Sequence, residues 1–237
     1  RMTAALCIAG GICLQLLEQA GISVLSRIRS IGPVNDRGQL LSSTADKPFP
    51  VVDEAQGEAM AQAIEAARME ADSVGGVIRC FALGLPAGVG EPMFDGVENR
   101  LAAALFGIPA VRGVSFGDGF AAAAMRGSQH NDPFITDGNT VRTRTNHAGG
   151  VLGGITTGMP LVVNVAIKPT ASIGREQDTV DLKEMVNTTL TIHGRRSLYC
   201  ATGAACGGGG DGSHFTGYAV GGIKYGSERL SQPTGHY

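Results

Sequence analysis

Tryptophan is absent from this chain of 237 residues, and aromatic residues of all kinds make up only 5% of it. Proteins that bind single-stranded nucleic acid stack bases on aromatic side chains, so we do not expect such a platform here. An excess of charge of one sign is also lacking, because 19 lysines and arginines nearly balance 21 aspartates and glutamates. The net charge of −2 gives no reason to expect nucleic acid or a membrane surface as a partner.

Cysteines are few, and their spacing does not suit a metal. The five of them are odd in number and form no CxxC pair, so we expect reduced thiols in a cytoplasmic protein and no metal site. The apolar stretch from Thr3 to Leu17 has no clear cleavage site and is too short to span a bilayer. It predicts a core helix rather than a signal peptide or a membrane anchor.

Glycine, in contrast, is abundant, with 36 residues. Five glycines fall between Asn146 and Met159, and such density lets the backbone approach a ligand closely and adopt positive φ. The apolar run Leu161–Ile167 then predicts a buried strand. Lys168, Thr170 and Ser172 follow it and supply a cation and two hydroxyls, which suits a phosphate-bearing planar cofactor. A glycine-rich hairpin that only turns the chain explains the glycines equally well, and the pattern is neither a P-loop nor a Rossmann fingerprint.

Helices and strands alternate along the rest of the chain. The length allows one large domain or two small ones, and the alternation indicates helix-covered sheets of the α/β or α+β class. We expect helices over residues 3–20, 53–71, 95–106 and 120–125, and strands over residues 22–31, 75–85 and 110–116.

A long polar segment, Gly127–Asn146, separates the last of these helices from the glycine-rich stretch. Unstructured loops of this length are uncommon and are usually functional or mobile. His130 lies within it and His147 follows it, and we interpret both as solvated rather than catalytic side chains. His193, further on, also invites a catalytic interpretation.

The glycine-rich stretch resembles the flavin-binding segment of chorismate synthases. NHAGGVLGGITTGMP at residues 146–160 and KPTASI at residues 168–173 follow that family's pattern, and further motifs come in the family's order. These motifs are R-x-T-A at residues 1–4, DSVGG at 72–76, GEPMFD at 90–95, IPAVRGVSFGDGF at 108–120 and GS at 127–128. The resemblance covers about four-fifths of the chain, from Arg1 to Arg195.

The resemblance implies an α+β fold, the β-α-β sandwich of chorismate synthases, in a homotetramer. It implies elimination of phosphate from 5-enolpyruvylshikimate 3-phosphate to give chorismate, with reduced FMN as cofactor. Some relatives also reduce flavin with NADP(H), but no nicotinamide site is evident here. The implied flavin contacts are Pro109, Ala110, Gly153, Lys168, Pro169, Thr170, Ala171, Ser172 and Arg195, and Arg1 is the implied substrate contact. Gly153 as a plain turn, Lys168 as a solvated strand end and Arg1 as a solvated terminus are the simpler alternatives.

Two departures from the family are visible. The family's catalytic histidines lie in G-x-S-H-G and H-A-D motifs that do not occur here, so we expect a chain that lacks the family's N-terminal third. After Arg195 the family's H-D-P-C is replaced by RSLYC, and a one-base shift of reading frame would restore Asp-Pro-Cys. We therefore expect a chorismate synthase-like domain over residues 1–195 and an aberrant glycine-rich tail over residues 196–237. The alternatives are a non-catalytic flavin- or phosphate-binding or oligomerisation module, and a phosphate-binding α/β domain of another role.

Overall fold

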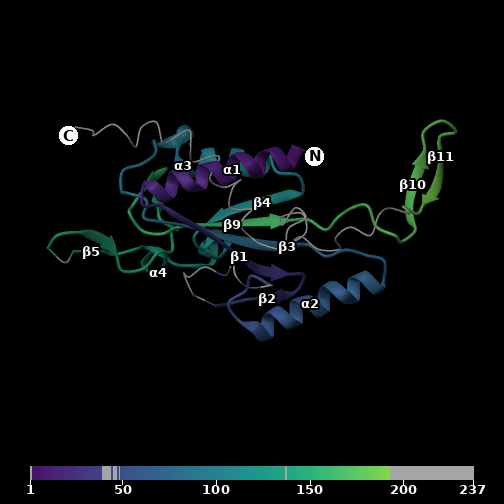
Figure 1. Cartoon of the computed structure of the whole chain (residues 1–237), viewed down its shortest axis with the longest axis horizontal. Coiled ribbons are helices and arrows are strands. Elements are labelled where there is room, and N and C mark those ends of the chain that lie inside the picture. Colours follow the sequence, from purple (N-terminus) through teal and green to yellow (C-terminus); the bar gives the residue numbers. More distant parts are fainter. Residues whose placement is uncertain (1, 39–43, 45–46, 48, 137, 193–237) are drawn as a thin grey trace.

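The computed structural model describes residues 2–38, 44, 47, 49–136 and 138–192. Its largest unit is a five-stranded antiparallel sheet of order β2-β1-β3-β9-β4 (Figure 1). The strands are β1 (Ser23–Ile31), β2 (Val34–Asn35), β3 (Gly76–Leu83), β4 (Val111–Phe116) and β9 (Leu161–Ile167). Strand β9 lies between β3 and β4, although it is the last of these five strands in the chain. Helices packed on an antiparallel sheet confirm the α+β class.

Two helices, α1 (Met2–Gln19) and α3 (Val97–Phe106), cover one face of this sheet (Figure 1). Along β9 every second residue is buried, beginning and ending with Leu161 and Ile167, and these side chains face the two helices. Alternation with period two is what a half-covered strand requires. The prediction of a buried strand at residues 161–167 is confirmed.

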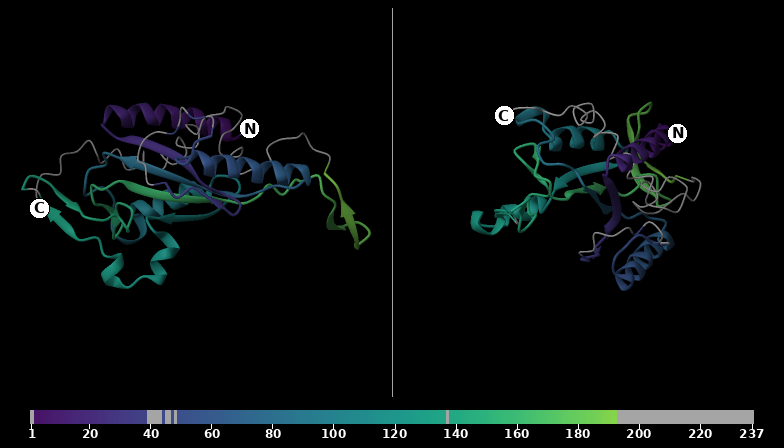
Figure 2. Two further views of the ribbon diagram at one scale, coloured as in Figure 1. Left: turned by 90° about the horizontal axis from the view of Figure 1, so that it is seen from below. Right: turned by 60° about the vertical axis from the view of Figure 1, so that its left-hand side comes forward.

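A third helix, α2 (Glu54–Met69), packs against β1 and β2 at the other end of the sheet (Figure 2). Asp53 begins it, because its Oδ1 accepts a hydrogen bond from the Ala55 N–H at 3.0 Å. Met60 is fully buried in a small second core beside Ile28 and Ile31. Met69, near the end of the helix, is 75% exposed, so the apolar residues of α2 are buried only in part.

The first helix is buried on one side only. Cys13 and Leu17 lie in the main core. The outer side of α1 carries large apolar side chains that the described residues leave 44–68% exposed, namely Leu6, Ile8, Ile12 and Leu16. The expectation of a core helix therefore holds for one face. No helix within the described ranges combines the length and the apolar character that crossing a bilayer demands.

Short elements fill the segments between the long ones. The predicted helix at residues 120–125 is a 3₁₀ helix, η2 (Gly119–Ala124), and a further 3₁₀ turn, η1 (Met93–Asp95), precedes α3. The long polar segment is not structureless, since it holds α4 (Gly127–His130) and a hairpin of β5 (Phe134–Thr136) and β6 (Val141–Thr143). The glycine-rich stretch forms the hairpin of β7 (Val151–Leu152) and β8 (Ile155–Thr156).

A last hairpin, β10 (Gln177–Asp181) and β11 (Val186–Leu190), stands away from the body of the molecule (Figure 1). Figure 2 shows the same separation from a second direction. We call it the arm. Its strands have no buried face and therefore no alternating hydrophobic pattern, so the arm is not predictable from the sequence.

Candidate functional site

Two of the segments that resemble flavin contacts meet at the end of β9. The Lys168 N–H donates a hydrogen bond to the Ala110 carbonyl oxygen at 2.9 Å, which joins residues 109–110 to residues 168–172. The DSVGG segment also lies here, since the Ser73 hydroxyl donates to the Thr170 carbonyl at 2.7 Å. All side chains from Lys168 to Ser172 are exposed. The Lys168 ammonium and the hydroxyls of Thr170 and Ser172 are thus exposed to solvent next to the end of β9, which the hydrogen bond to Ala110 holds in place.

Ala110 has an unusual backbone. Its φ is +71°, in the left-handed region that residues with a Cβ seldom occupy. Such conformations cost about 1–3 kcal/mol and cluster at ligand-binding sites. The strain lies at one of the residues that sequence resemblance assigns to flavin, and it could not have been seen in the sequence.

Gly153 does not join this cluster. It lies at the β7–β8 turn, where the neighbouring Gly154 carbonyl accepts a hydrogen bond from the N–H of Val97, the first residue of α3. Ala110 follows the other end of α3, and a helix of ten residues is about 15 Å long. Gly153 has φ +60° and open space where a Cβ would stand, so the turn accounts for the glycine. The glycine-rich stretch does form a hairpin, and flavin contact at Gly153 stays a prediction.

The remaining predicted contacts, Arg1 and Arg195, lie outside the described residues, as do His193 and the whole segment 196–237. Their roles, and the boundary at residue 195, stay predictions.

His147 is not the solvated side chain that the sequence suggested. Its Nδ1 lies 2.6 Å from Asp118 Oδ2, and both side chains are about one-third exposed. The Asp118 N–H donates to the His147 carbonyl at 2.9 Å, so backbone and side chain join the same two residues. The ring of His130 lies 6.0 Å away, centroid to centroid. His147 and Asp118 are 29 residues apart in the sequence, so no local sequence pattern predicts that they pair.

Asp132 anchors the same turn from the other side. Its carboxylate accepts hydrogen bonds from Thr145 Oγ1 at 2.6 Å, the His147 N–H at 2.8 Å and the Ala148 N–H at 2.9 Å. Burial raises the pKa of this carboxyl, but the three hydrogen bonds and the nearby His147 outweigh burial, and the net pKa is lowered.

Acid should weaken this anchor. Because the pKa of Asp132 is lower in the folded than in the unfolded chain, its contribution to stability is complete above the unfolded pKa of about 4 and is lost as the pH falls through the folded value. We expect Asp132→Asn to lower the free energy of unfolding at pH 6. Below about pH 4, the free energy of unfolding of this variant should decrease less steeply with falling pH than that of the unchanged chain. Urea unfolding at several pH values measures this. Thr145→Val removes one donor and should reduce the acid dependence in part, whereas an acid dependence unchanged in Asp132→Asn would contradict the assignment.

Polar side chains form a row across the face of the sheet that α1 and α3 leave open. Arg27 lies opposite Arg79, which lies opposite Asn164. Arg79 Nε donates to Asn164 Oδ1 at 2.6 Å, and Asn164 Nδ2 donates to Ser115 Oγ at 3.3 Å. Burial, with help from the neighbouring arginines, lowers the pKa of Arg79 to about 10, and Asp118 opposes this. The row is a positively charged strip that ends near the His147–Asp118 pair.

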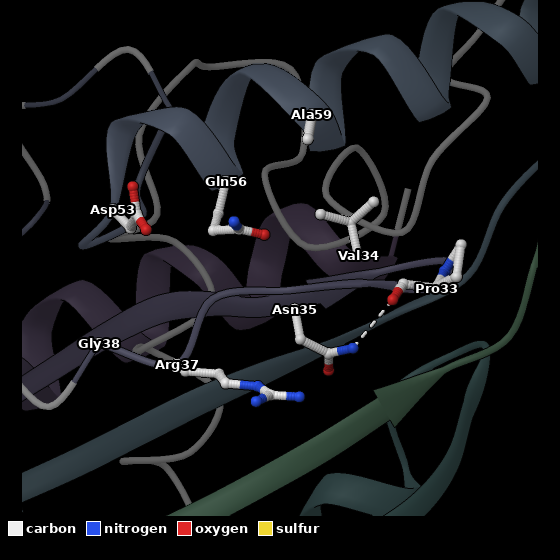
Figure 3. A pocket seen from close by; sticks show the side chains of 8 residues that line it. All are labelled: Pro33, Val34, Asn35, Arg37, Gly38, Asp53, Gln56 and Ala59. Carbon is white, nitrogen blue, oxygen red and sulfur yellow. Dashed lines mark hydrogen bonds between the residues drawn. The ribbon is translucent and has the colours of Figure 1, made fainter.

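A separate hollow of about 700 Å³ lies between β2 and the start of α2 (Figure 3). Polar side chains such as Asn35, Arg37 and Asp53 line it, and none of the predicted flavin contacts that the structure describes does. No group of three or more potential metal ligands occurs among the described residues.

Comparison with known proteins supports the resemblance. The family model described as chorismate synthase matches residues 1–206. Chorismate synthase of Thermococcus gammatolerans is 49% identical over 196 residues, which are 82% of this chain and 55% of the relative. That of Korarchaeum cryptofilum is 44% identical over 199 residues, with the same coverage of 82% and 55%. The chain thus spans about half the length of the curated relatives it matches.

The fold agrees with these matches. A crystal structure of a chorismate synthase superposes with a TM-score of 0.70 at 27% identity and covers 97% of this chain and 64% of the solved one. The motifs that suggested the family from the sequence, the segments that meet at the end of β9 and the matches to whole proteins all agree. This chain belongs to the chorismate synthase family.

Proposed function

We propose that the chain acts as a chorismate synthase, a phosphate-eliminating carbon–oxygen lyase that converts 5-enolpyruvylshikimate 3-phosphate to chorismate in the biosynthesis of aromatic amino acids. The observation that carries the proposal is the hydrogen bond between the Lys168 N–H and the Ala110 carbonyl. It joins two segments, far apart in sequence, that family resemblance assigns to one flavin. The proposed setting is a homotetramer in the cytoplasm.

The residues at the end of β9 fit the cofactor proposed for them. The Lys168 ammonium and the hydroxyls of Thr170 and Ser172 are exposed and offer a cation and hydrogen-bond donors to the phosphate of FMN. The strained backbone of Ala110 offers a close approach without a large side chain. Pro169 and Ala171 space these groups. When bound, reduced FMN supplies electron density as the C–O bond to phosphate breaks and recovers it afterwards.

Arg1 and Arg195 complete the proposal. Arg195 would add a second cation beside the flavin, and Arg1 would hold an anionic group of the substrate. Two bound anions in one site require such cations, because like charges brought together repel strongly where water is excluded.

Replacing Lys168 with methionine tests the flavin site. A charged hydrogen bond of this kind is worth about 1.5–3 kcal/mol, so the dissociation constant for FMN should rise about 10- to 100-fold. Quenching of flavin fluorescence measures it. Lys183→Met is the matched control, because it removes a lysine that is 90% exposed at the tip of the arm, and it should leave the affinity unchanged. An equal rise in the dissociation constant for FMN in both variants would show that Lys168 does not contact the flavin.

A second candidate is a non-catalytic module that binds flavin or phosphate. The exposed Lys168, Thr170 and Ser172 at the end of β9 suit such a module as well, because they need only hold an anion. Release of phosphate from the substrate in the presence of reduced FMN decides between the two. FMN binding without phosphate release supports the module, and failure to bind FMN at all contradicts both.

A further inference from the structure

Strand β4 has one residue more than β9 at the place where β9 ends. The paired residues of β4 step from Val111 to Gly113. Those of β9 step from Ile167 to its neighbour Ala166. Arg112 is thus the extra residue of a β-bulge and has no partner on β9. Bulges change the direction in which a side chain points and are over-represented next to active sites.

The bulge lies beside the segments that resemble flavin contacts. Ala110, two residues before Arg112, accepts the hydrogen bond from the Lys168 N–H. Arg112 and Lys168 are therefore diagonal neighbours on adjacent strands, with Cα atoms about 7–8 Å apart. Long side chains meet across such a diagonal. The guanidinium and the ammonium can therefore reach one small ligand.

Both cations point away from the core. Val111 and Ile167 are buried in the core that α1 and α3 cover, whereas the residue after each, Arg112 and Lys168, is exposed. Successive side chains of a strand point to opposite faces. Arg112 and Lys168 therefore leave the sheet on the side that the two helices do not cover.

No carboxylate of the described residues neutralises these two cations. The side chains of Arg112 and Lys168 form no ion pair or hydrogen bond within the part of the chain that the structure describes. Arg175, in the segment that follows Lys168, differs. Its Nη1 lies 3.1 Å from Asp72 Oδ2 and 3.8 Å from Glu70 Oε2. The charges of Arg112 and Lys168 thus remain available for an anion.

We propose that Arg112 is a further residue of the flavin site, where its guanidinium and the Lys168 ammonium together bind the phosphate group of FMN. A guanidinium donates two parallel hydrogen bonds to phosphate oxygens, and an ammonium adds a point charge. The inference rests on the proposed binding of FMN and adds to it a residue that the family resemblance does not assign. Arg112 acts by binding and orienting the cofactor.

Riboflavin, which is FMN without its phosphate group, separates a phosphate contact from any other role. In the full 237-residue chain, Arg112→Met should raise the dissociation constant for FMN about 10- to 100-fold and leave that for riboflavin unchanged. Quenching of flavin fluorescence measures both constants. Arg112→Lys keeps the charge without the two parallel donors, and it should recover part of the affinity for FMN.

Arg142 provides the matched control. It is also exposed, and its side chain forms no ion pair or hydrogen bond with a described residue. It lies on β6, in the hairpin at the opposite end of the molecule from the end of β9 (Figure 1). Arg142→Met removes the same charge and should leave both dissociation constants unchanged.

The outcomes separate this inference from the proposed function. An unchanged chain that binds no FMN would overturn both. If the chain binds FMN and Arg112→Met does not weaken that binding, only the inference is overturned. A fall in affinity for 5-enolpyruvylshikimate 3-phosphate alone would assign Arg112 to the phosphate of the substrate and overturn the flavin assignment. An equal loss of FMN and riboflavin affinity would also overturn it, because such a loss reports a change of structure rather than of a phosphate contact.

Discussion

Replacing Gly117 with alanine should destabilise the protein by about 2–5 kcal/mol, the sum of a left-handed backbone and an overpacked contact. Gly117 has φ +53°, and an added Cβ would stand 2.6 Å from the Gly149 nitrogen and 2.7 Å from the Ala148 carbonyl carbon. It would lie closer still to the His147 carbonyl oxygen. All three are backbone atoms, which cannot turn aside as the end of a side chain can. The strand end would have to separate from the turn that carries His147.

Gly21→Ala separates the two causes. Gly21 also has a left-handed backbone, with φ +77°, but nothing lies within 4 Å of its added Cβ. Gly21→Ala should lower the free energy of unfolding by only about 1–2 kcal/mol, which is the cost of the left-handed backbone alone. Urea unfolding of both variants gives the comparison. Equal losses would mean that Gly117 and the His147 turn are not in contact.

Leu105→Ala should lower the free energy of unfolding by about 2–5 kcal/mol, the range for replacing a buried leucine with alanine in a packed core. Leu105 is fully buried between α3 and the sheet. Its neighbour Phe106 provides the control, because this larger side chain is 53% exposed, and Phe106→Ala should cost less than about 1 kcal/mol. Denaturant unfolding measures both. A greater loss from Phe106→Ala would contradict the orientation of α3.

The effect of Leu105→Ala should extend to the site. Pro109 and Ala110 lie shortly after the end of helix α3 at Phe106, and the first N–H of the helix donates to the β7–β8 turn. A helix that shifts into the cavity would move the Ala110 carbonyl that receives the Lys168 N–H. FMN affinity of this variant should therefore fall together with its stability.

Elements with strong local signals were predictable from the sequence. The strand at residues 161–167 shows an apolar run of strand length, and α2 begins at an aspartate that caps it. Both signals arise from contacts within a few residues, or from burial that repeats with the period of the element. The family motifs added the site, because they marked residues 109–110 and 168–172 before their hydrogen bond was known.

Features that depend on distant partners were not predictable. The His147–Asp118 pair joins two loops, and nothing near either residue indicates the other. The strained φ of Ala110 occurs in the connection between α3 and β4, where no residue type indicates it. The arm has no buried face, so it leaves no hydrophobic pattern to read. Gly153 lies apart from the other expected contacts because it is near the start of α3, whereas Ala110 lies beyond the end of this helix. The resemblance of the sequence does not predict this separation.

The central position of β9 also governs how the chain can fold. β3 and β4 both pair with β9, and β9 begins 45 residues after β4 ends. During synthesis, β1 and β3 can pair early, but β4 has no neighbouring strand in this sheet until residue 167 has left the ribosome. The sheet must then close by inserting its last strand between two earlier ones. Contacts between residues so far apart in the sequence slow folding, so the half-made sheet, with two open edges, is the stage at which a chaperone would be most useful.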